Sequence, residues 1–188
     1  PAGHGRCAHA DRTAEVFSAP RPAADGQDYL PIGVGEVPQR GGEYHAVYAN
    51  IEAAQAARED VAQGMGAAIT YIANSAVEQI GDPYALAIMQ DVLKNDAPLA
   101  QLGVFLARWC AQLDKPLVLL DEVDALVGDT LISLLRQLRA GYPNRPQQFP
   151  QTVMLCGVRD IQDYRIQSAE GKAVITGGSA FNIKAKSL

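Results

Sequence analysis

Four consecutive apolar residues, Leu117 to Leu120, run directly into the paired acids Asp121 and Glu122. Successive side chains of a strand point to opposite faces, so an unbroken apolar run is typical of a strand that is buried on both faces of a parallel sheet. Thr152 to Cys156 form a second run of this kind. We therefore predict an α/β fold in which a parallel sheet carries helices on both faces.

The segments before this strand alternate between strand and helix patterns. Tyr44 to Asn50 is a short β-prone run, and an alanine-rich helical stretch extends from Ala53 to about Ile80, where Gly81, Asp82 and Pro83 end it. Another helix is predicted from Pro98. Its apolar residues recur at spacings of three and four, as expected for one buried face: Leu99, Leu102, Phe105, Leu106 and Trp109.

One more helix is predicted between the two apolar strands. Asp129 is expected to cap it, and Gly141 is expected to end it in a left-handed conformation. Its inner stripe consists of Leu131, Leu134, Leu135 and Leu138. The predicted order from Gly41 is thus β-α-α-β-α-β. In parallel α/β sheets a ligand binds beyond the carboxyl ends of the strands, so the residues that follow each strand are the candidates for a site.

Asp121 and Glu122 occupy such a position. Four apolar residues followed by Asp-Glu form a Walker B pattern, in which the first acid holds Mg²⁺, usually through water, and the second orients the water that attacks the γ-phosphate. A buried strand that ends in a solvated acidic turn shows the same pattern, so its surroundings decide between the two interpretations.

Three segments supply these surroundings: Pro116 to Leu126 followed by Gly128 and Asp129, then Gly157-Val158-Arg159-Asp160, and finally Gly177 to Ile183. Together they resemble the AAA-like ATP-binding proteins of bacteria, over roughly Gly41 to Leu188. The resemblance implies a P-loop NTPase fold of the additional-strand type, with ATP and Mg²⁺ as ligands. It also implies a strand at Phe181 to Ile183 and, beyond Leu188, a helical lid, so that the core is expected to be incomplete.

The same resemblance assigns roles to individual residues. It implies that Glu122 is catalytic, that Asp121 binds the metal and the nucleotide, and that a polar sensor position lies at the strand tip near Cys156 and Gly157. Arg159 is a candidate for sensing the γ-phosphate or for an interface. The alternative for Arg159 is a surface side chain that pairs with a neighbouring acid.

The phosphate-binding loop itself is missing, because no G-x-x-x-x-G-K-[ST] string occurs in the chain. Residues 1–40 are rich in Pro and Gly without periodicity, and we expect them to form an irregular leader before a partial ATPase core at 41–188. A shift of reading frame would explain both features. Read one base over, the codons of Arg21 to Tyr29 permit A-P-R-Q-T-G-K-T-T, and those of Pro31 to Arg40 permit an amphipathic helix that joins Gly41. The alternative is a genuine disordered leader, or a variant that lost nucleotide binding.

The charge and hydropathy of the chain limit the kinds of partner that it is expected to bind. The net charge of -5 and pI near 5.1 do not indicate nucleic-acid binding. No apolar run approaches the roughly 18 residues of a membrane span, and three scattered cysteines suit a reducing cytoplasm. The predicted function is ATP binding and hydrolysis, impaired as the chain is written, and a homo-oligomer or another protein partner stays open. The alternatives are a non-catalytic relic of an ATPase core and a metal-dependent nuclease that uses Asp121, Glu122 and Asp124.

Overall fold

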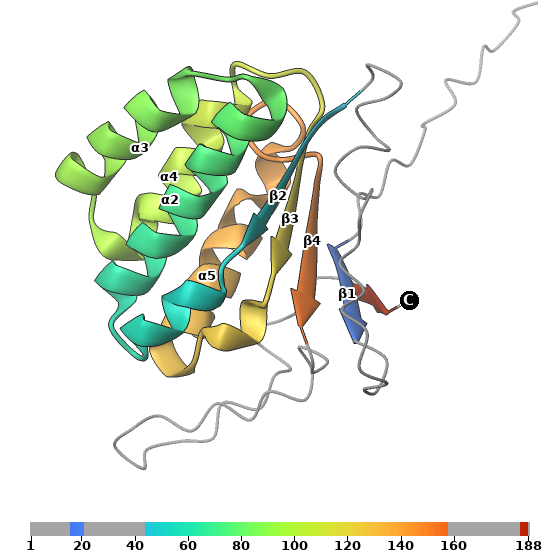
Figure 1. Cartoon of the computed structure of the whole chain (residues 1–188). Coiled ribbons are helices and arrows are strands. Elements are labelled where there is room, and N and C mark those ends of the chain that lie inside the picture. The colour runs from blue at the N-terminus through green and yellow to red at the C-terminus, as the bar shows by residue number, and fades with distance from the viewer. Residues whose placement is uncertain (1–15, 21–43, 158–184, 188) are drawn as a thin grey trace, which may run out of the picture.

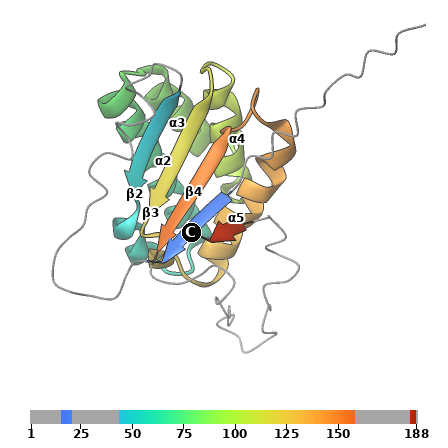
Figure 2. The same ribbon diagram turned by 90° about the vertical axis from the view of Figure 1, so that its right-hand side faces the viewer.

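A computed structural model of the chain describes residues 16–20, 44–157 and 185–187. Its strands form one sheet of order β2-β3-β4-β1-β5, in which every neighbouring pair is parallel. The strands are β1 (Val16–Pro20), β2 (His45–Asn50), β3 (Pro116–Asp121), β4 (Thr152–Gly157) and β5 (Ala185–Ser187). The carboxyl ends of β2, β3 and β4 lie at the same edge (Figure 2). The predicted α/β class with a parallel sheet is therefore confirmed.

The described helices form a layer on one face of this sheet (Figure 1). They are α2 (Val61–Ile80), α3 (Tyr84–Asn95), α4 (Pro98–Cys110) and α5 (Gly128–Gly141), with short 3₁₀ turns η1 (Glu52–Ala57), η2 (Val123–Ala125) and η3 (Tyr142–Asn144). Residues 44–157 provide no helix for the opposite face, so the prediction of helices on both faces is only partly met by the part of the chain that the structure describes. No described helix is long and apolar enough to cross a membrane.

The core lies between the sheet and this helical layer. Every residue of β3 is buried, as the apolar run predicts, and its alternate side chains Val118 and Leu120 face the helices together with Val153 and Leu155 of β4. Trp109 and Phe105 of α4 stack with their ring centroids 5.9 Å apart. The amphipathic stripes predicted for α4 and α5 are accordingly the faces that bury apolar surface.

The structure contains a helix that the sequence analysis does not predict. After Gly81 ends α2 in a left-handed conformation (φ 69°), the Asp82 carboxylate accepts a hydrogen bond from the Tyr84 backbone N–H at 2.9 Å. That bond begins α3, whose buried residues are Ala85, Ile88 and Val92. The order from β2 to β4 thus has three α-helices between the first two strands. The sequence analysis overlooked this stripe, although Leu86, Met89 and Leu93 flank it as further apolar residues packed against the core.

The predicted cap of α5 is wrong, whereas its predicted end is right in position, since α5 ends at Gly141, but wrong in conformation. Asp129 lies in the first turn of α5, while Val127 is the N-cap residue and makes no side-chain capping bond. Gly141 is right-handed (φ −76°) rather than left-handed. A Cβ at Gly141 would overlap the buried ring of Phe149, so this glycine is needed for close packing and not for its backbone freedom.

The helix predicted from Ala53 to Ile80 is interrupted. Arg58 adopts φ 49° between η1 and α2, and its carbonyl oxygen accepts a hydrogen bond of 2.7 Å from the Thr130 hydroxyl. Asp60 then caps α2 by accepting the Gln63 backbone N–H at 3.1 Å. The interruption lets η1 lie at the carboxyl edge of the sheet while α2 covers its face.

The predicted irregular leader differs from the structure at one place. Val16–Pro20 is β1, a strand inside the sheet that pairs with β4 on one side and β5 on the other. A strand can form without a periodic sequence when two neighbours supply its hydrogen bonds, which a pattern search does not detect. The rest of the predicted leader, the altered frame around Arg21 to Tyr29 and the predicted strand at Phe181 to Ile183 lie outside the described residues.

Candidate functional site

The paired acids lie where the sequence analysis places them, at the carboxyl end of β3. Asp121 is the last residue of the strand and is only 5% exposed, while Glu122 follows in a left-handed conformation (φ 58°, ψ 39°) and is partly exposed. The left-handed residue turns the chain sharply out of the sheet and into η2. One acid is thereby held within the sheet edge, and the next begins the loop.

Both carboxylate oxygens of Asp121 have hydrogen-bond donors. The Tyr48 hydroxyl donates to Oδ2 at 2.7 Å, and the Glu122 backbone N–H donates to Oδ1 at 3.0 Å. The Asp121 carbonyl oxygen accepts the Ile51 N–H at 3.0 Å, which joins the ends of β2 and β3. The orientation of this carboxylate is therefore set from the neighbouring strand and from the turn.

Tyr48 reaches Asp121 because of the strand register. Asn50 pairs with Asp121 and Tyr48 with Leu119, so Tyr48 lies one alternation earlier on the same face of the sheet as the acid. Burial, followed by the hydrogen bond and the negative charge of Asp121, raises the pKa of Tyr48 to about 12. The hydroxyl consequently stays protonated and remains a donor at neutral pH.

The backbone of Tyr48 is held by Gln79 near the end of α2. The Gln79 side-chain amide accepts the Tyr48 N–H at 2.9 Å and donates to the Tyr48 carbonyl oxygen at 2.7 Å. Because β2 stands at an edge of the described sheet, these two backbone groups face away from β3, and the amide satisfies both in the way that another strand would.

The neighbouring strand β4 ends beside η2. A Cβ at Gly157 would lie 2.6 Å from Oδ1 of Asp124, so the third acid packs closely against the tip of β4. Cys156, at the predicted sensor tip, is half-buried on the face that also carries Tyr48 and Asp121. Arg159 lies outside the described residues, and its predicted role is untested.

The donor chemistry of this edge fits one kind of metal contact. Mg²⁺ prefers oxygen ligands and commonly keeps several waters while it uses one or two carboxylates and substrate phosphates, which matches an Asp121 and Glu122 pair. Among residues 44–157 and the short strands β1 and β5, no cluster of three or more His, Cys, Asp or Glu side chains has the geometry to enclose a metal. The described residues thus suit a metal that shares its ligands with a substrate and not a closed metal site.

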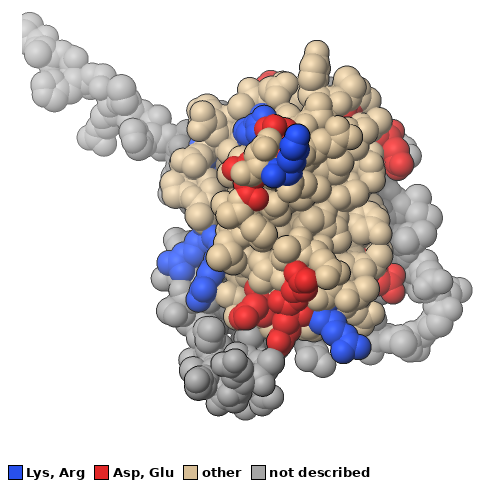
Figure 3. All heavy atoms as spheres, turned by 90° about the vertical axis from the view of Figure 1, so that its left-hand side faces the viewer, with Lys and Arg blue, Asp and Glu red and all other residues tan. Residues whose placement is uncertain are grey.

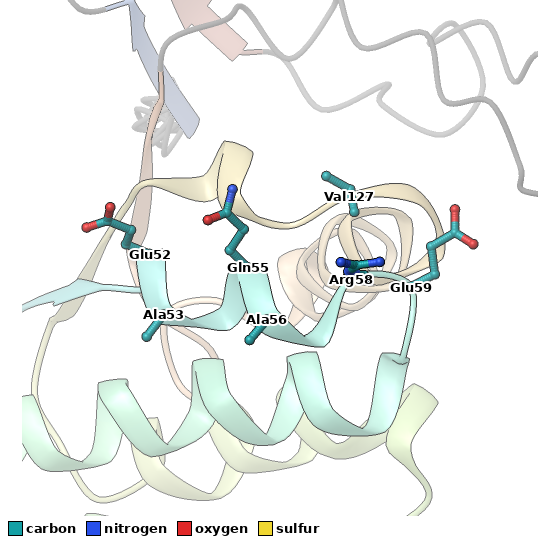
Figure 4. A pocket seen from close by; sticks show the side chains of 7 residues that line it. All are labelled: Glu52, Ala53, Gln55, Ala56, Arg58, Glu59 and Val127. Atoms are coloured by element: carbon teal, nitrogen blue, oxygen red, sulfur yellow. The ribbon is translucent and has the colours of Figure 1, made fainter.

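An open depression lies along η1 (Figure 4). Its volume is about 1130 Å³, and it is lined by side chains of η1 and of the following turn together with Val127, which faces them: Glu52, Ala53, Gln55, Ala56, Arg58, Glu59 and Val127. Neither Asp121 nor Glu122 lines it, so the depression and the acid pair are separate features. On the helix-covered side, the described residues carry acidic and basic side chains together and form no broad basic face (Figure 3).

The sequence analysis found Asp121 and Glu122 but missed Tyr48 and Gln79. The alternation of β2 puts Tyr48 on the same face as Asn50 at the strand's end, and this could have marked Tyr48 as a candidate for the site. Nothing in the sequence predicts that Gln79 contacts a residue 31 positions away. Comparisons with protein-family models, with curated proteins and with solved structures find no match to this chain.

Proposed function

We propose that the chain is the core of an AAA-like P-loop ATPase, in which Asp121 holds Mg²⁺ through water and Glu122 orients the attacking water. The observation that carries this proposal is the position of the two acids at the carboxyl end of a strand that is buried on both faces. Ligands of parallel α/β sheets bind at this edge, and the pair supplies the oxygen atoms that a metal and a polarised water need.

The order of the strands supports the same proposal. In an additional-strand P-loop sheet, a further strand stands between the strand that leads into the phosphate loop and the strand that bears the acids. Here β4 lies between β1 and β3, and β1 directly precedes the segment whose shifted codons permit a phosphate loop. The order β2-β3-β4-β1-β5 supports the proposed additional-strand fold.

Nucleotide binding fits the chain less well than the metal does. A phosphate loop supplies backbone N–H groups, a lysine and a hydroxyl, and the sequence contains no G-x-x-x-x-G-K-[ST] string to supply them. Positioning and charge stabilisation account for nearly all of the catalysis in phosphoryl transfer, so we expect this chain to have negligible ATPase activity. This observation favours the second candidate function, a non-catalytic relic of an ATPase core.

The metal-dependent nuclease is less well supported by the described residues. Such a site needs Asp124 to join Asp121 and Glu122 around a metal. Asp124 instead lies against Gly157 at the tip of β4, and the described acids form no metal-enclosing cluster.

The deciding experiment compares this chain with a protein whose coding frame is restored before Gly41. We would measure binding of a fluorescent ATP analogue and release of phosphate with Mg²⁺ present. The restored protein should bind and hydrolyse ATP, whereas this chain should do neither. Glu122→Gln in the restored protein should retain binding and reduce turnover by about 100-fold or more.

Four outcomes contradict parts of the proposal. Tight ATP binding by the unrestored chain means that phosphate is held elsewhere, and full turnover by the Glu122→Gln variant means that the catalytic role is misassigned. A restored protein that binds no nucleotide supports the relic. Cutting of DNA that depends on Mg²⁺ but is indifferent to ATP supports the nuclease.

A further inference from the structure

The carboxylate of Asp121 is held by a side chain from another strand. The Tyr48 hydroxyl approaches Oδ2 at 2.7 Å across the β2–β3 pair, and Gln79 holds the Tyr48 backbone through two hydrogen bonds of 2.9 and 2.7 Å. These contacts form a continuous connection from the end of α2, through the edge strand, to the acid. A surface tyrosine that only fills space would need neither the hydrogen bond to Asp121 nor those to Gln79.

We propose that Tyr48 is a positioning residue for Asp121, which selects the carboxylate orientation that binds the metal, and that Gln79 fixes Tyr48 for this task. The inference rests on the proposed function, because it assigns a metal to Asp121. A donor on one oxygen restricts the rotation of a carboxylate while leaving acceptor capacity on both oxygens, since each can accept more than one bond. Hydrogen-bond partners of this kind orient the ligands of metal sites and strengthen metal binding.

The hydrogen bond between Tyr48 and Asp121 is suited to hold the carboxylate in one orientation. A hydrogen bond to an ionised carboxylate is short and strong, and 2.7 Å lies in the range of O–H to carboxylate bonds. The site is only partly buried, so water competes for Oδ2 whenever the tyrosine hydroxyl is removed. The tyrosine therefore replaces a mobile water by a donor whose position is set by the backbone of β2.

The test uses the full chain, labelled for NMR, and needs no nucleotide. Couplings between Cγ of Asp121 and its backbone N and carbonyl carbon report whether χ1 is fixed or averaged. MnCl₂ is then titrated, and paramagnetic broadening of backbone amides locates the metal and gives its apparent Kd. The variants are Tyr48→Phe, which removes only the hydroxyl, Gln79→Glu, which replaces the donating amide by a negatively charged carboxylate, and Asp121→Asn. Tyr71→Phe is the matched control, because Tyr71 lies on α2 away from the acids.

We expect a single χ1 rotamer in the unmodified chain and Mn²⁺ broadening centred on Asp121 and Glu122 that Asp121→Asn abolishes. Tyr48→Phe should average χ1 and raise the apparent Kd for Mn²⁺ by about tenfold, while Tyr71→Phe changes neither. Gln79→Glu should act in the same direction as Tyr48→Phe, and it decides the matter if the tyrosine variant does not fold.

Two results overturn the inference, and they differ in what else they remove. If Tyr48→Phe and Gln79→Glu keep the fixed rotamer and the Mn²⁺ affinity while Asp121→Asn abolishes binding, the positioning role is wrong and the proposed metal role of Asp121 stands. If broadening is absent from the acids, or is unaffected by Asp121→Asn, the metal assignment is wrong and the positioning role falls with it.

Discussion

Substitution by alanine should have opposite effects on stability at two glycines of α2. Gly64 and Gly66 both lie inside this helix, where alanine has the higher helix propensity by about 1 kcal/mol. A Cβ at Gly66 would meet only Leu93 Cδ2 at 3.8 Å, an ordinary contact. A Cβ at Gly64 would lie less than 3.0 Å from Cγ2 of Thr130, closer than real Cβ atoms approach a heavy atom.

The cost at Gly64 follows from what holds Thr130. That residue is fully buried on α5, and its hydroxyl donates to the Arg58 carbonyl oxygen at 2.7 Å, so turning its methyl away also breaks this bond. Overpacking costs about 1–3 kcal/mol, and a lost hydrogen bond costs about 1 kcal/mol. After subtraction of the propensity gain, Gly64→Ala should lower the free energy of unfolding by about 2 kcal/mol, whereas Gly66→Ala should raise it by about 1 kcal/mol.

Urea unfolding of the two variants tests this reasoning, provided that the m value is unchanged. Thr130→Ser supplies a further check, because it deletes the clashing methyl and keeps the hydroxyl. Combined with Gly64→Ala, it should recover most of the loss, which appears as a coupling energy of about 2 kcal/mol in a double-mutant cycle. A Gly64→Ala variant that is stabilised as much as Gly66→Ala would refute the close approach of α2 and α5.

Three further predictions concern titratable and buried groups. The pKa of Tyr48 is raised, so its contribution to stability is fully present below its unfolded pKa near 10 and is lost as pH rises towards 12. The shift corresponds to about 2.7 kcal/mol before screening and about 1 kcal/mol after it, so urea midpoints should fall more steeply between pH 10 and 12 for the unmodified chain than for Tyr48→Phe. Asp82→Ala leaves the buried Trp109 indole N–H without the acceptor that it meets at 2.8 Å, and chemical unfolding should show a loss of about 2 kcal/mol. Burial raises the pKa of the Cys110 thiol, so alkylation followed by peptide mass spectrometry should find Cys110 unmodified until the chain unfolds, and labelling at the native rate of an exposed thiol would contradict its burial.

Local patterns in the sequence were sufficient for most elements of residues 44–157. The spacing of apolar residues predicted which faces are buried in β2, β3, α4 and α5. This is possible because the period of a strand or helix assigns each sequence position to one face of the element. The position of Asp121 and Glu122 followed in the same way, since any residue directly after a parallel strand lies at its carboxyl edge. The stripe of α3 has the same periodicity and was overlooked.

Only the tertiary structure decided which side chains of different elements contact one another. Tyr48 meets Asp121 through the register of two strands that are 73 residues apart in the chain, and Thr130 meets Arg58 across 72. β1 is a strand because β4 and β5 flank it, and position 141 requires glycine because the ring of Phe149 occupies the space beside it. Local periodicity specifies which face of an element is buried but not which neighbour covers it. Docking fixes the partner of each side chain, and the restraint on Asp121 therefore became visible only in the folded chain.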